Sequence, residues 1–326
     1  MRIAVTGSSG YVGTSLLRRL AWADWVEAVL AVDLRRPHCE YPESVTFERH
    51  DVRDSLDDLF REFEPDAVVH LAFVLEPGRD EEAIREVNLG GTTNALAATA
   101  AAGAKHFLYF GSTTIYGPHP DNPRWLTEDS PPRPLPGFQY AVDKLGSEDL
   151  ISKFAEANPD IRVGILRGCP VMGPNARNFI SRAFAKPLLI GLRGYDPPMQ
   201  FLHEDDLVDL LEKGLRDRLS GVYNVAGEGV VRWSEMARML GRSVVTLPAS
   251  VLYALASATW SLRLQSDAPA AGLAFIQHRW TASTEKIKRE LGVSFSHTSS
   301  EAWSAYAQRL GRRGARAAWR ASACGP

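Results

Sequence analysis

Short apolar runs alternate with amphipathic stretches through the first half of the chain. We predict strands at residues 2–6, 28–32, 45–48, 67–71, 106–110 and 161–166. Helical periodicity begins between them, near Tyr11, Ser55, Glu81 and Tyr140. Strands that alternate with helices are typical of right-handed βαβ units. The pattern therefore predicts an α/β fold with a doubly wound parallel sheet, the Rossmann architecture.

The pattern loosens after residue 169. Segments rich in proline and glycine, such as 186–198, separate helices that we predict near Val208, Ser234 and Val251. Residues 221–226 have the pattern of a short strand, and we expect the segments near 200–226 to return to the main sheet. We therefore predict a main domain over residues 1–169 and a smaller C-terminal lobe formed mainly by residues 170–326.

A glycine-rich turn follows the first predicted strand and opens the first helix. It reads TGSSGYVG over residues 6–13. Glycine permits a tight turn, and the N–H groups at a helix N-terminus stabilise a pyrophosphate. The candidate cofactor-binding residues in this turn are Gly7, Gly10, Tyr11, Val12 and Gly13. A glycine-rich turn without a ligand is the alternative interpretation.

The second strand ends in an acidic residue, Asp33, about 20 residues after the turn. A carboxylate at this place accepts hydrogen bonds from the adenosine ribose and repels a 2′-phosphate, so NAD is favoured as the cofactor. Arg35 follows closely and keeps NADP as an alternative, because a guanidinium binds phosphate. The strands that come next predict further cofactor contacts at Asp51, Val52, Leu71 and Ala72.

Tyr140 and Lys144 lie four residues apart on one face of a predicted helix. Free tyrosine has a pKa near 10, and acid–base work near neutral pH requires a value lower by about 3, equivalent to about 4 kcal/mol. We expect the Lys144 ammonium to lower the pKa of the Tyr140 phenol in this way. Ser112, at the end of the fifth strand, could donate a hydrogen bond to a substrate oxygen while Tyr140 exchanges its proton.

These motifs resemble those of the extended short-chain dehydrogenase/reductase family, the group of sugar-nucleotide epimerases and dehydratases. The matching segments are TGSSGYVG at Thr6, Asp33, HDV at His50, HLA at His70, VNLGGT at Val87, GSTTIYG at Gly111, YAVDK at Tyr140, LRGCPVMGP at Leu166, FLHEDDLV at Phe201 and YNVAG at Tyr223. The resemblance implies that Tyr140 is the catalytic acid/base, that Lys144 also binds the nicotinamide ribose, and that Ser112 assists. It also implies a cofactor role for Asn88 and a position beside the nicotinamide for Pro170.

Two departures from the family pattern concern the substrate. Family dehydratases carry an Asp-Glu pair, and related decarboxylases a carboxylate, where this chain has Thr113 and Thr114, which disfavours both reactions. Nucleotide-sugar epimerases commonly have an arginine before the aromatic-hydrophobic-His segment, where Met199 cannot neutralise a phosphate. The candidate substrate-binding residues are Thr113, Asn175, Arg177 and Met199, with Arg182, Arg193 and Arg279 as alternative cations.

Three functions follow from this pattern. The resemblance implies an NAD-dependent epimerase that acts on a sugar nucleotide or related hydroxylated substrate. An NAD(P)-dependent dehydrogenase or ketoreductase of a non-nucleotide alcohol or ketone is the alternative that Met199 favours. A dinucleotide-binding sensor without catalysis is the third. The family also implies a homodimer, with the helices near Asn88 and Tyr140 as the candidate interface.

The composition of the chain disfavours several other classes of protein. Of 326 residues, 45% are apolar and 23% charged, as in ordinary globular proteins, and the net charge of −2 gives no reason to expect nucleic acid. Cys39, Cys169 and Cys324 lack the spacing of a zinc site or disulfide framework, so we expect no metal and a cytoplasmic location. The chain starts without a cationic leader, and no run reaches the ~20 apolar residues of a membrane span, so we expect neither a signal peptide nor a membrane anchor.

Overall fold

The computed structural model describes residues 1–37, 40–76, 78, 80–186, 188–264 and 269–314. Cys39 and Cys324 lie outside these residues. Seven described strands form one parallel sheet in the order β11-β6-β5-β4-β1-β2-β3. Their bounds are β1 Arg2–Thr6, β2 Ala28–Asp33, β3 Val45–Arg49, β4 Ala67–His70, β5 His106–Ser112, β6 Arg162–Gly168 and β11 Gly221–Val225. The predicted doubly wound parallel sheet is confirmed, and each of the six strands of the first half ends within two residues of its predicted bounds.

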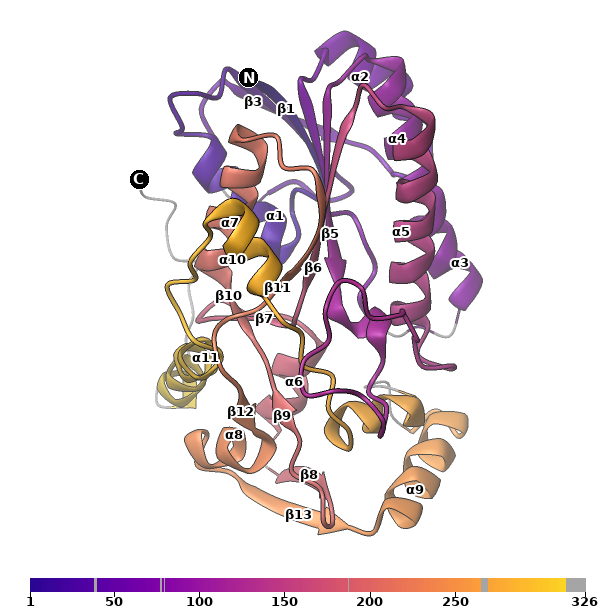
Figure 1. Cartoon of the computed structure of the whole chain (residues 1–326), viewed down its shortest axis with the longest axis vertical. Coiled ribbons are helices and arrows are strands. Elements are labelled where there is room, and N and C mark those ends of the chain that lie inside the picture. The colour runs from indigo at the N-terminus through magenta and orange to yellow at the C-terminus, as the bar shows by residue number, and fades with distance from the viewer. Residues whose placement is uncertain (38–39, 77, 79, 187, 265–268, 315–326) are drawn as a thin grey trace.

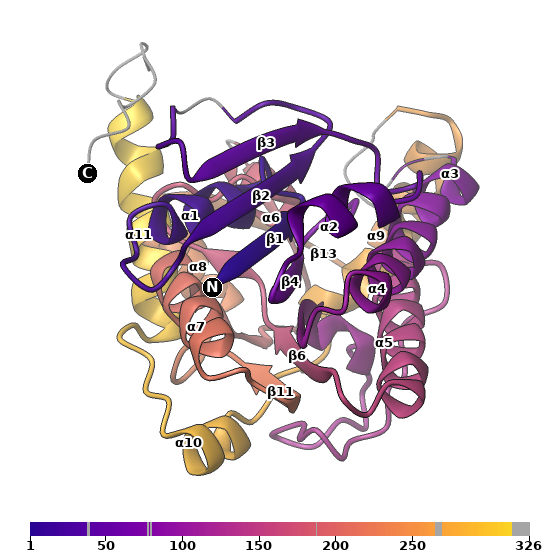
Figure 2. The same ribbon diagram turned by 90° about the horizontal axis from the view of Figure 1, so that it is seen from above.

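Helices cover both faces of this sheet, as Figure 2 shows from above. One face carries α1 (Tyr11–Leu20), α7 (Glu204–Arg216) and α10 (Glu285–Leu291), and the other carries α2 (Asp57–Phe63), α4 (Gly91–Ala101) and α5 (Gln139–Ala157). Side chains alternate between the two faces along each strand, so Val5 packs with the first group and Ala4 with the second. Because both of its faces are covered, the middle of the sheet is largely apolar, as in β1 and β4, and this made these strands predictable, whereas the edge strand β3 is partly exposed and carries Glu48 and Arg49.

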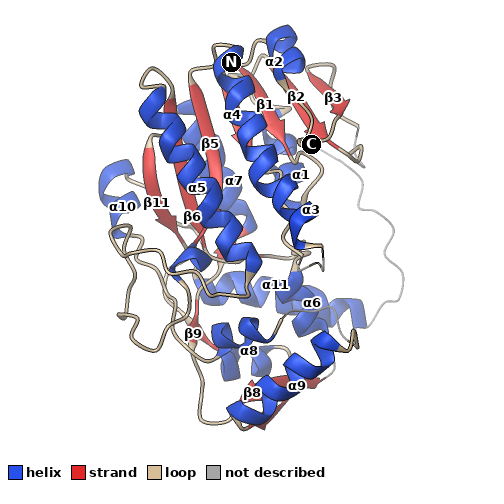
Figure 3. Ribbon diagram, turned by 90° about the vertical axis from the view of Figure 1, so that its right-hand side faces the viewer, coloured by secondary structure: helices blue, strands red, loops and turns tan. Residues whose placement is uncertain are grey.

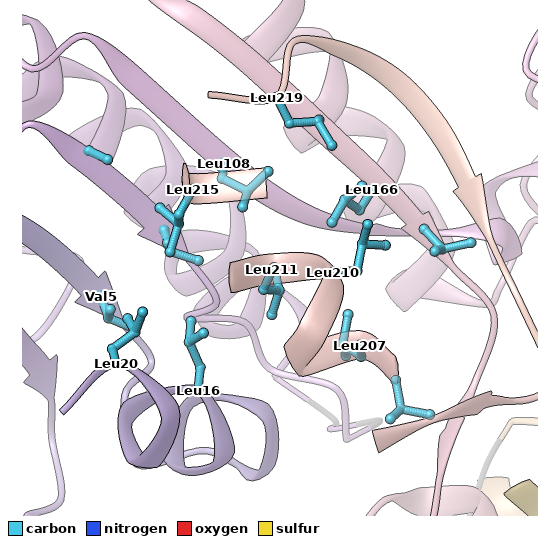
Figure 4. Packing of buried hydrophobic residues seen from close by; sticks show 14 of the residues in the cluster. Val5, Leu16, Leu20, Leu108, Leu166, Leu207, Leu210, Leu211, Leu215 and Leu219 are labelled. Carbon is cyan, nitrogen blue, oxygen red and sulfur yellow. The ribbon is translucent and has the colours of Figure 1, made fainter. Parts of the chain in front are cut away.

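Leucine is the commonest residue in the core between α1, α7 and the sheet. Leu16 and Leu20 of α1 meet Leu207 and Leu211 of α7 over the sheet (Figure 4). These positions repeat every three or four residues, so each helix turns one apolar stripe inward. The segment after residue 200 is thereby held against the main sheet, and β11 pairs with β6 at the sheet edge.

The remaining elements gather beyond the carboxyl ends of the strands (Figures 1 and 3). They include three small two-stranded sheets: β7 (Val171–Met172) with β10 (Leu202–His203), β9 (Pro198–Met199) with β12 (Val231–Arg232), and β8 (Leu188–Leu192) with β13 (Ser243–Leu247). The helices are α6 (Phe179–Ala185), α8 (Trp233–Met239), α9 (Ala249–Ser261), the 3₁₀ helix η3 (Ala270–Ile276) and α11 (Ser299–Gly314). A second core surrounds Trp303, which packs against Phe184 and Phe201.

The helix predicted to begin near Glu81 is confirmed, and the helical stretch continues to Ala101 in three parts. A short helix α3 (Glu81–Arg85) passes through a π-helical turn η1 (Glu86–Gly90) into α4. Residues 91–101 are almost uniformly small and lack an amphipathic period, so the sequence alone does not mark where the helix ends. Among the described helices, none is both long and apolar enough to cross a bilayer.

Candidate active site

The glycine-rich turn lies at the carboxyl end of β1, where the chain enters α1. Gly7 has φ +71° and sits so close to the next loop that an added Cβ would lie 2.5 Å from Ala72 N. An added Cβ on Gly13 would lie 2.2 Å from Gly7 O. Residues with side chains are therefore excluded at both positions. Gly10 is the N-cap of α1 and has no side chain that could cap the first turn. The N–H groups of that turn are therefore available to an anion.

Asp33 ties this turn to the end of β2. Its Oδ2 accepts from Ser9 N at 3.0 Å and its Oδ1 from Arg35 N at 3.1 Å. After β3, Asp51 forms a close pair with Arg53, whose Nη2 lies 2.6 Å from Asp51 Oδ2. The hydrogen bonds from the Arg53 side chain lower the pKa of the Asp51 carboxyl. A carboxylate and a guanidinium thus stand together at the edge where the sequence predicted only the carboxylate.

Lys144 is buried between α5 and the sheet. Its Nζ donates to Phe110 O at 2.8 Å and to Tyr109 Oη at 3.2 Å, and lies 3.7 Å from the centre of the Phe73 ring. Burial lowers the pKa of Lys144 to about 7, and the negative charge of Glu148 one turn later opposes this change. A lysine in this position is poised between its charged and neutral forms near neutral pH.

The pKa of Tyr140 differs from its prediction. Burial raises the pKa of its phenol to about 12, and the opposing cause is a hydrogen bond with Ser112. The expectation that Lys144 lowers this pKa is wrong for the structure as it stands, because desolvation dominates. Lys144 Nζ is turned toward the main chain, 6.0 Å from the Tyr140 ring centre.

Ser112 has its hydroxyl oriented by its neighbour. Thr114 donates to Ser112 Oγ from its own hydroxyl at 2.9 Å and from its backbone N–H at 3.2 Å. Since both acceptor positions of the oxygen are then used, the Ser112 proton is free to be donated toward Tyr140 or a substrate oxygen. The three candidate catalytic side chains therefore come together at the carboxyl edge of β5.

A cavity of about 1130 Å³ joins the glycine-rich turn to these side chains and continues into the lobe. Most of the predicted residues line it: Gly7, Gly10, Tyr11, Val12, Gly13, Asp33, Arg35, Asp51, Val52, Leu71, Ala72, Ser112, Tyr140, Lys144, Pro170, Arg177 and Met199. Residues drawn from the ends of six strands thus surround one space. This is the location expected for a ligand crevice in a doubly wound sheet.

Three predicted residues lie off this wall. Asn88 is fully buried behind it, accepting from Val74 N at 2.8 Å and donating to Asp143 at 3.0 Å, so it holds the loop after β4 rather than the cavity surface. Thr113 is buried in the 3₁₀ turn η2 (Thr113–Tyr116), and the wall position falls to Thr114. Asn175 turns to Glu204, to which its side chain donates at 2.8 Å.

Of the four arginines proposed as substrate-binding cations, only one lines the cavity. Arg177 lines the cavity, whereas Arg182, which forms an ion pair with Glu76, is not on its wall, and neither are Arg193 and Arg279. Among the described residues, no cluster of three or more His, Cys, Asp or Glu side chains is placed to hold a metal ion.

Comparison with known proteins assigns the family. Residues 3–235 match the model of the NAD dependent epimerase/dehydratase family. The chain belongs to this family. The resemblance noted from the motifs is thereby confirmed.

Relatives of this epimerase/dehydratase family member extend over most of its length. An uncharacterized protein of Mycobacterium tuberculosis is 29% identical over 314 residues, covering 93% of this chain and 82% of that protein. GDP-6-deoxy-D-mannose reductase of Pseudomonas aeruginosa is 32% identical over 257 residues, covering 73% of this chain and 79% of that protein. The crystal structure of UDP-glucose 4-epimerase from Thermus thermophilus in complex with NAD has a TM-score of 0.75 at 24% identity, covering 97% of this chain and 100% of that one.

Several wall residues of this family member were missed by the sequence analysis. Phe73 packs edge-to-face on Tyr140, with ring centres 5.7 Å apart, and Phe138 contacts Tyr140 from another side. Phe73 directly follows the HLA segment at the end of β4, so its position was a usable signal. Phe138 lies two residues before Tyr140 and was likewise within reach of the sequence, whereas Trp280 comes from a segment without a motif and only the fold brings it to the cavity.

Proposed function

We propose that this chain is an NAD-dependent oxidoreductase that interconverts a secondary alcohol and its ketone, with Tyr140 as the acid/base. The observation that carries this proposal is the convergence of Ser112, Tyr140 and Lys144 on the same cavity as the glycine-rich turn. Family membership is consistent with it. A sensor without catalysis would have no need of these three groups together.

The residues at the other end of the cavity fit NAD. Gly7, Gly10 and Gly13 allow the pyrophosphate to approach the uncapped first turn of α1. Asp33 lies on the wall where the adenosine ribose would bind, and its carboxylate would repel a 2′-phosphate. NAD is therefore preferred, with Arg35 as the residue through which NADP would have to be accepted. When bound, NAD supplies a hydride acceptor and a positively charged ring.

In the oxidation direction, the substrate carbon loses a hydride and its hydroxyl loses a proton. Ser112 donates a hydrogen bond to the substrate oxygen, and Tyr140 accepts the proton. With a pKa of about 12, the Tyr140 phenol is mostly protonated near neutral pH. In the cofactor-free protein Tyr140 is therefore better suited to the reduction direction, in which it donates its proton to a ketone. A positive charge on Lys144 would favour the phenolate that results, but with its Nζ 6.0 Å from the ring centre it does not outweigh the desolvation of the phenol.

Epimerisation is the second candidate, because it uses the same groups and the UDP-glucose 4-epimerase of Thermus thermophilus shares the fold. An epimerase returns the hydride to its own substrate and keeps its cofactor oxidised. A dehydrogenase consumes one NADH for each ketone reduced. Measurement of net NADH consumption with a ketone, against interconversion of UDP-glucose and UDP-galactose, distinguishes the two.

The proposed chemistry is tested by Tyr140→Phe. We expect loss of at least about 100-fold in turnover, within the range of general acid–base catalysis, with NADH affinity unchanged by fluorescence titration. Tyr195→Phe removes the hydroxyl of an exposed tyrosine off the cavity wall and serves as the matched control. Turnover in Tyr140→Phe equal to that of the control would rule out Tyr140 as the acid/base.

The assembly and the location stay predictions. A homodimer through α4 and α5 would be tested by light scattering on the purified protein. The cytoplasmic location would be tested by cell fractionation.

A further inference from the structure

The part of the cavity beyond Tyr140 is walled by hydrocarbon and aromatic side chains. We call this part the distal chamber, and its wall includes Phe138, Met199, Leu252, Leu255, Phe275 and Trp280, with neighbouring residues of α6 and β8. The aromatic rings pack on one another, with centres 4.8 Å apart for Phe138 and Phe275 and 5.0 Å for Phe275 and Trp280. They form a continuous apolar surface next to the reacting oxygen.

Most polar groups on this wall already have partners in the protein. Trp280 Nε1 donates to Phe275 O at 3.3 Å, Thr259 Oγ1 to Leu255 O at 2.8 Å, and Asn178 Nδ2 to Val171 O at 2.9 Å. Trp233 Nε1, buried without a partner among the described residues, is the exception. A ligand with many polar groups would lose its hydrogen bonds to water here without replacement, which is costly.

Charge is also scarce in the distal chamber. The described charged residues on or beside its wall are Arg177, Lys186 and Glu76, and all three are exposed. The adjoining segment 243–262, which includes α9, contains no charged residue. A nucleoside diphosphate carries two or more negative charges, and such charges are buried only when paired.

The helix α9 turns one apolar face to the chamber. Leu252, Leu255, Ala256 and Thr259 line the cavity at the three- and four-residue spacing of one helical face. Leu255 nevertheless leaves 49% of its surface exposed. A ligand that lies against this face would cover that surface and gain from its removal from water.

We propose, resting on the hydride transfer described above, that the distal chamber binds the hydrocarbon body of an apolar secondary alcohol or its ketone. The oxygen of this substrate lies at Ser112 and Tyr140, and its carbon skeleton extends between α6, β8 and α9. This proposal favours the dehydrogenase over the epimerase, because the sugar and diphosphate of a sugar nucleotide would meet an apolar wall in the distal chamber.

The first test is a series of methyl ketones of increasing length, from hexanone to dodecanone, with NADH as the reductant. Burial of one methylene corresponds to about 0.8 kcal/mol, so kcat/KM should rise about 3- to 4-fold for each carbon added until the chamber is full. UDP-glucose should neither react nor inhibit. A flat dependence on chain length, or competition by UDP-glucose against the ketone, would overturn the assignment.

The second test measures binding without hydride transfer, using the neutral fluorophore N-phenylnaphthylamine. Leu255→Glu places a charge on the chamber wall and should weaken the probe by about 10-fold or more. Val251→Glu is the matched control: Val251 lies one turn earlier on α9, is similarly exposed at 44%, and is off the wall. Its variant should bind the probe as wild type does.

The two tests separate this proposal from the proposed function. Probe binding that is lost in Leu255→Glu and kept in Val251→Glu supports the chamber assignment, even if no ketone is reduced, and the absence of reduction would then count against hydride transfer. Failure of the wild-type protein to bind the probe, or equal weakening in both variants, overturns the chamber assignment whatever the turnover.

Discussion

Replacement of Lys144 by methionine should stabilise the cofactor-free protein while it removes activity. The Lys144 side chain is 4% exposed, and burial lowers its pKa from 10.5 to about 7. At about 1.4 kcal/mol for each pH unit, keeping this lysine charged in the folded state costs up to about 5 kcal/mol. Methionine has a similar length and packs well against aromatic rings such as Phe73. It leaves Phe110 O without its donor, which offsets about 1–3 kcal/mol of the gain.

The stability gain should depend on pH in a definite direction. Between pH 7 and 10.5 the unfolded chain binds the lysine proton and the folded protein does not, so the stability of the wild type rises with pH across this window. Below pH 7 both states are protonated and the full penalty applies. We expect Lys144→Met to be more stable than wild type by about 2–4 kcal/mol at pH 6, and this advantage to fall by about 2–3 kcal/mol between pH 6 and pH 9.

Urea unfolding followed by tryptophan fluorescence, at pH 6, 7, 8 and 9, measures this difference. Lys153→Met is the matched control, since Lys153 is exposed on the same helix α5 and its loss should leave the pH profile of stability unchanged. A difference between wild type and Lys144→Met that stays constant from pH 6 to pH 9 would refute the reasoning. So would a variant less stable than wild type at pH 6.

Three further predictions concern the site. Ser112→Ala removes the hydrogen bond that lowers the pKa of Tyr140. The kcat for ketone reduction should fall about 10- to 100-fold and the pH–rate profile should move to higher pH, and an unmoved profile would contradict this role. Asp33→Ala should weaken NAD more than NADP in fluorescence titrations, and equal affinities before and after the change would show that the ribose does not bind there. Gly13→Ala places a Cβ 2.2 Å from Gly7 O, so it should lower the stability by about 1–3 kcal/mol and weaken NAD binding. Gly90→Ala is the control, since no atom lies within 4 Å of the added Cβ, and it should have little effect in the same thermal unfolding and titration assays.

The sequence by itself determined the framework of the protein. Strands buried on both faces must be apolar along their whole length, so β1 and β5 could be read directly from their composition. The turn at Gly7 requires a positive φ, and Asp33 and Lys144 occupy positions set by strand ends and helical spacing. These features depend on residues close together in the chain, and local patterns are sufficient for them.

Only the tertiary structure decided how the site is tuned and what it can hold. The pKa of Tyr140 rises because its phenol is buried, in part against Phe73 from the loop after β4, and no local pattern around Tyr140 records that burial. Asn88 and Asn175 carry the right chemistry, yet packing turns them to Asp143 and Glu204. The apolar chamber is likewise assembled from segments more than 100 residues apart, since desolvation depends on everything that surrounds a group rather than on its neighbours in sequence.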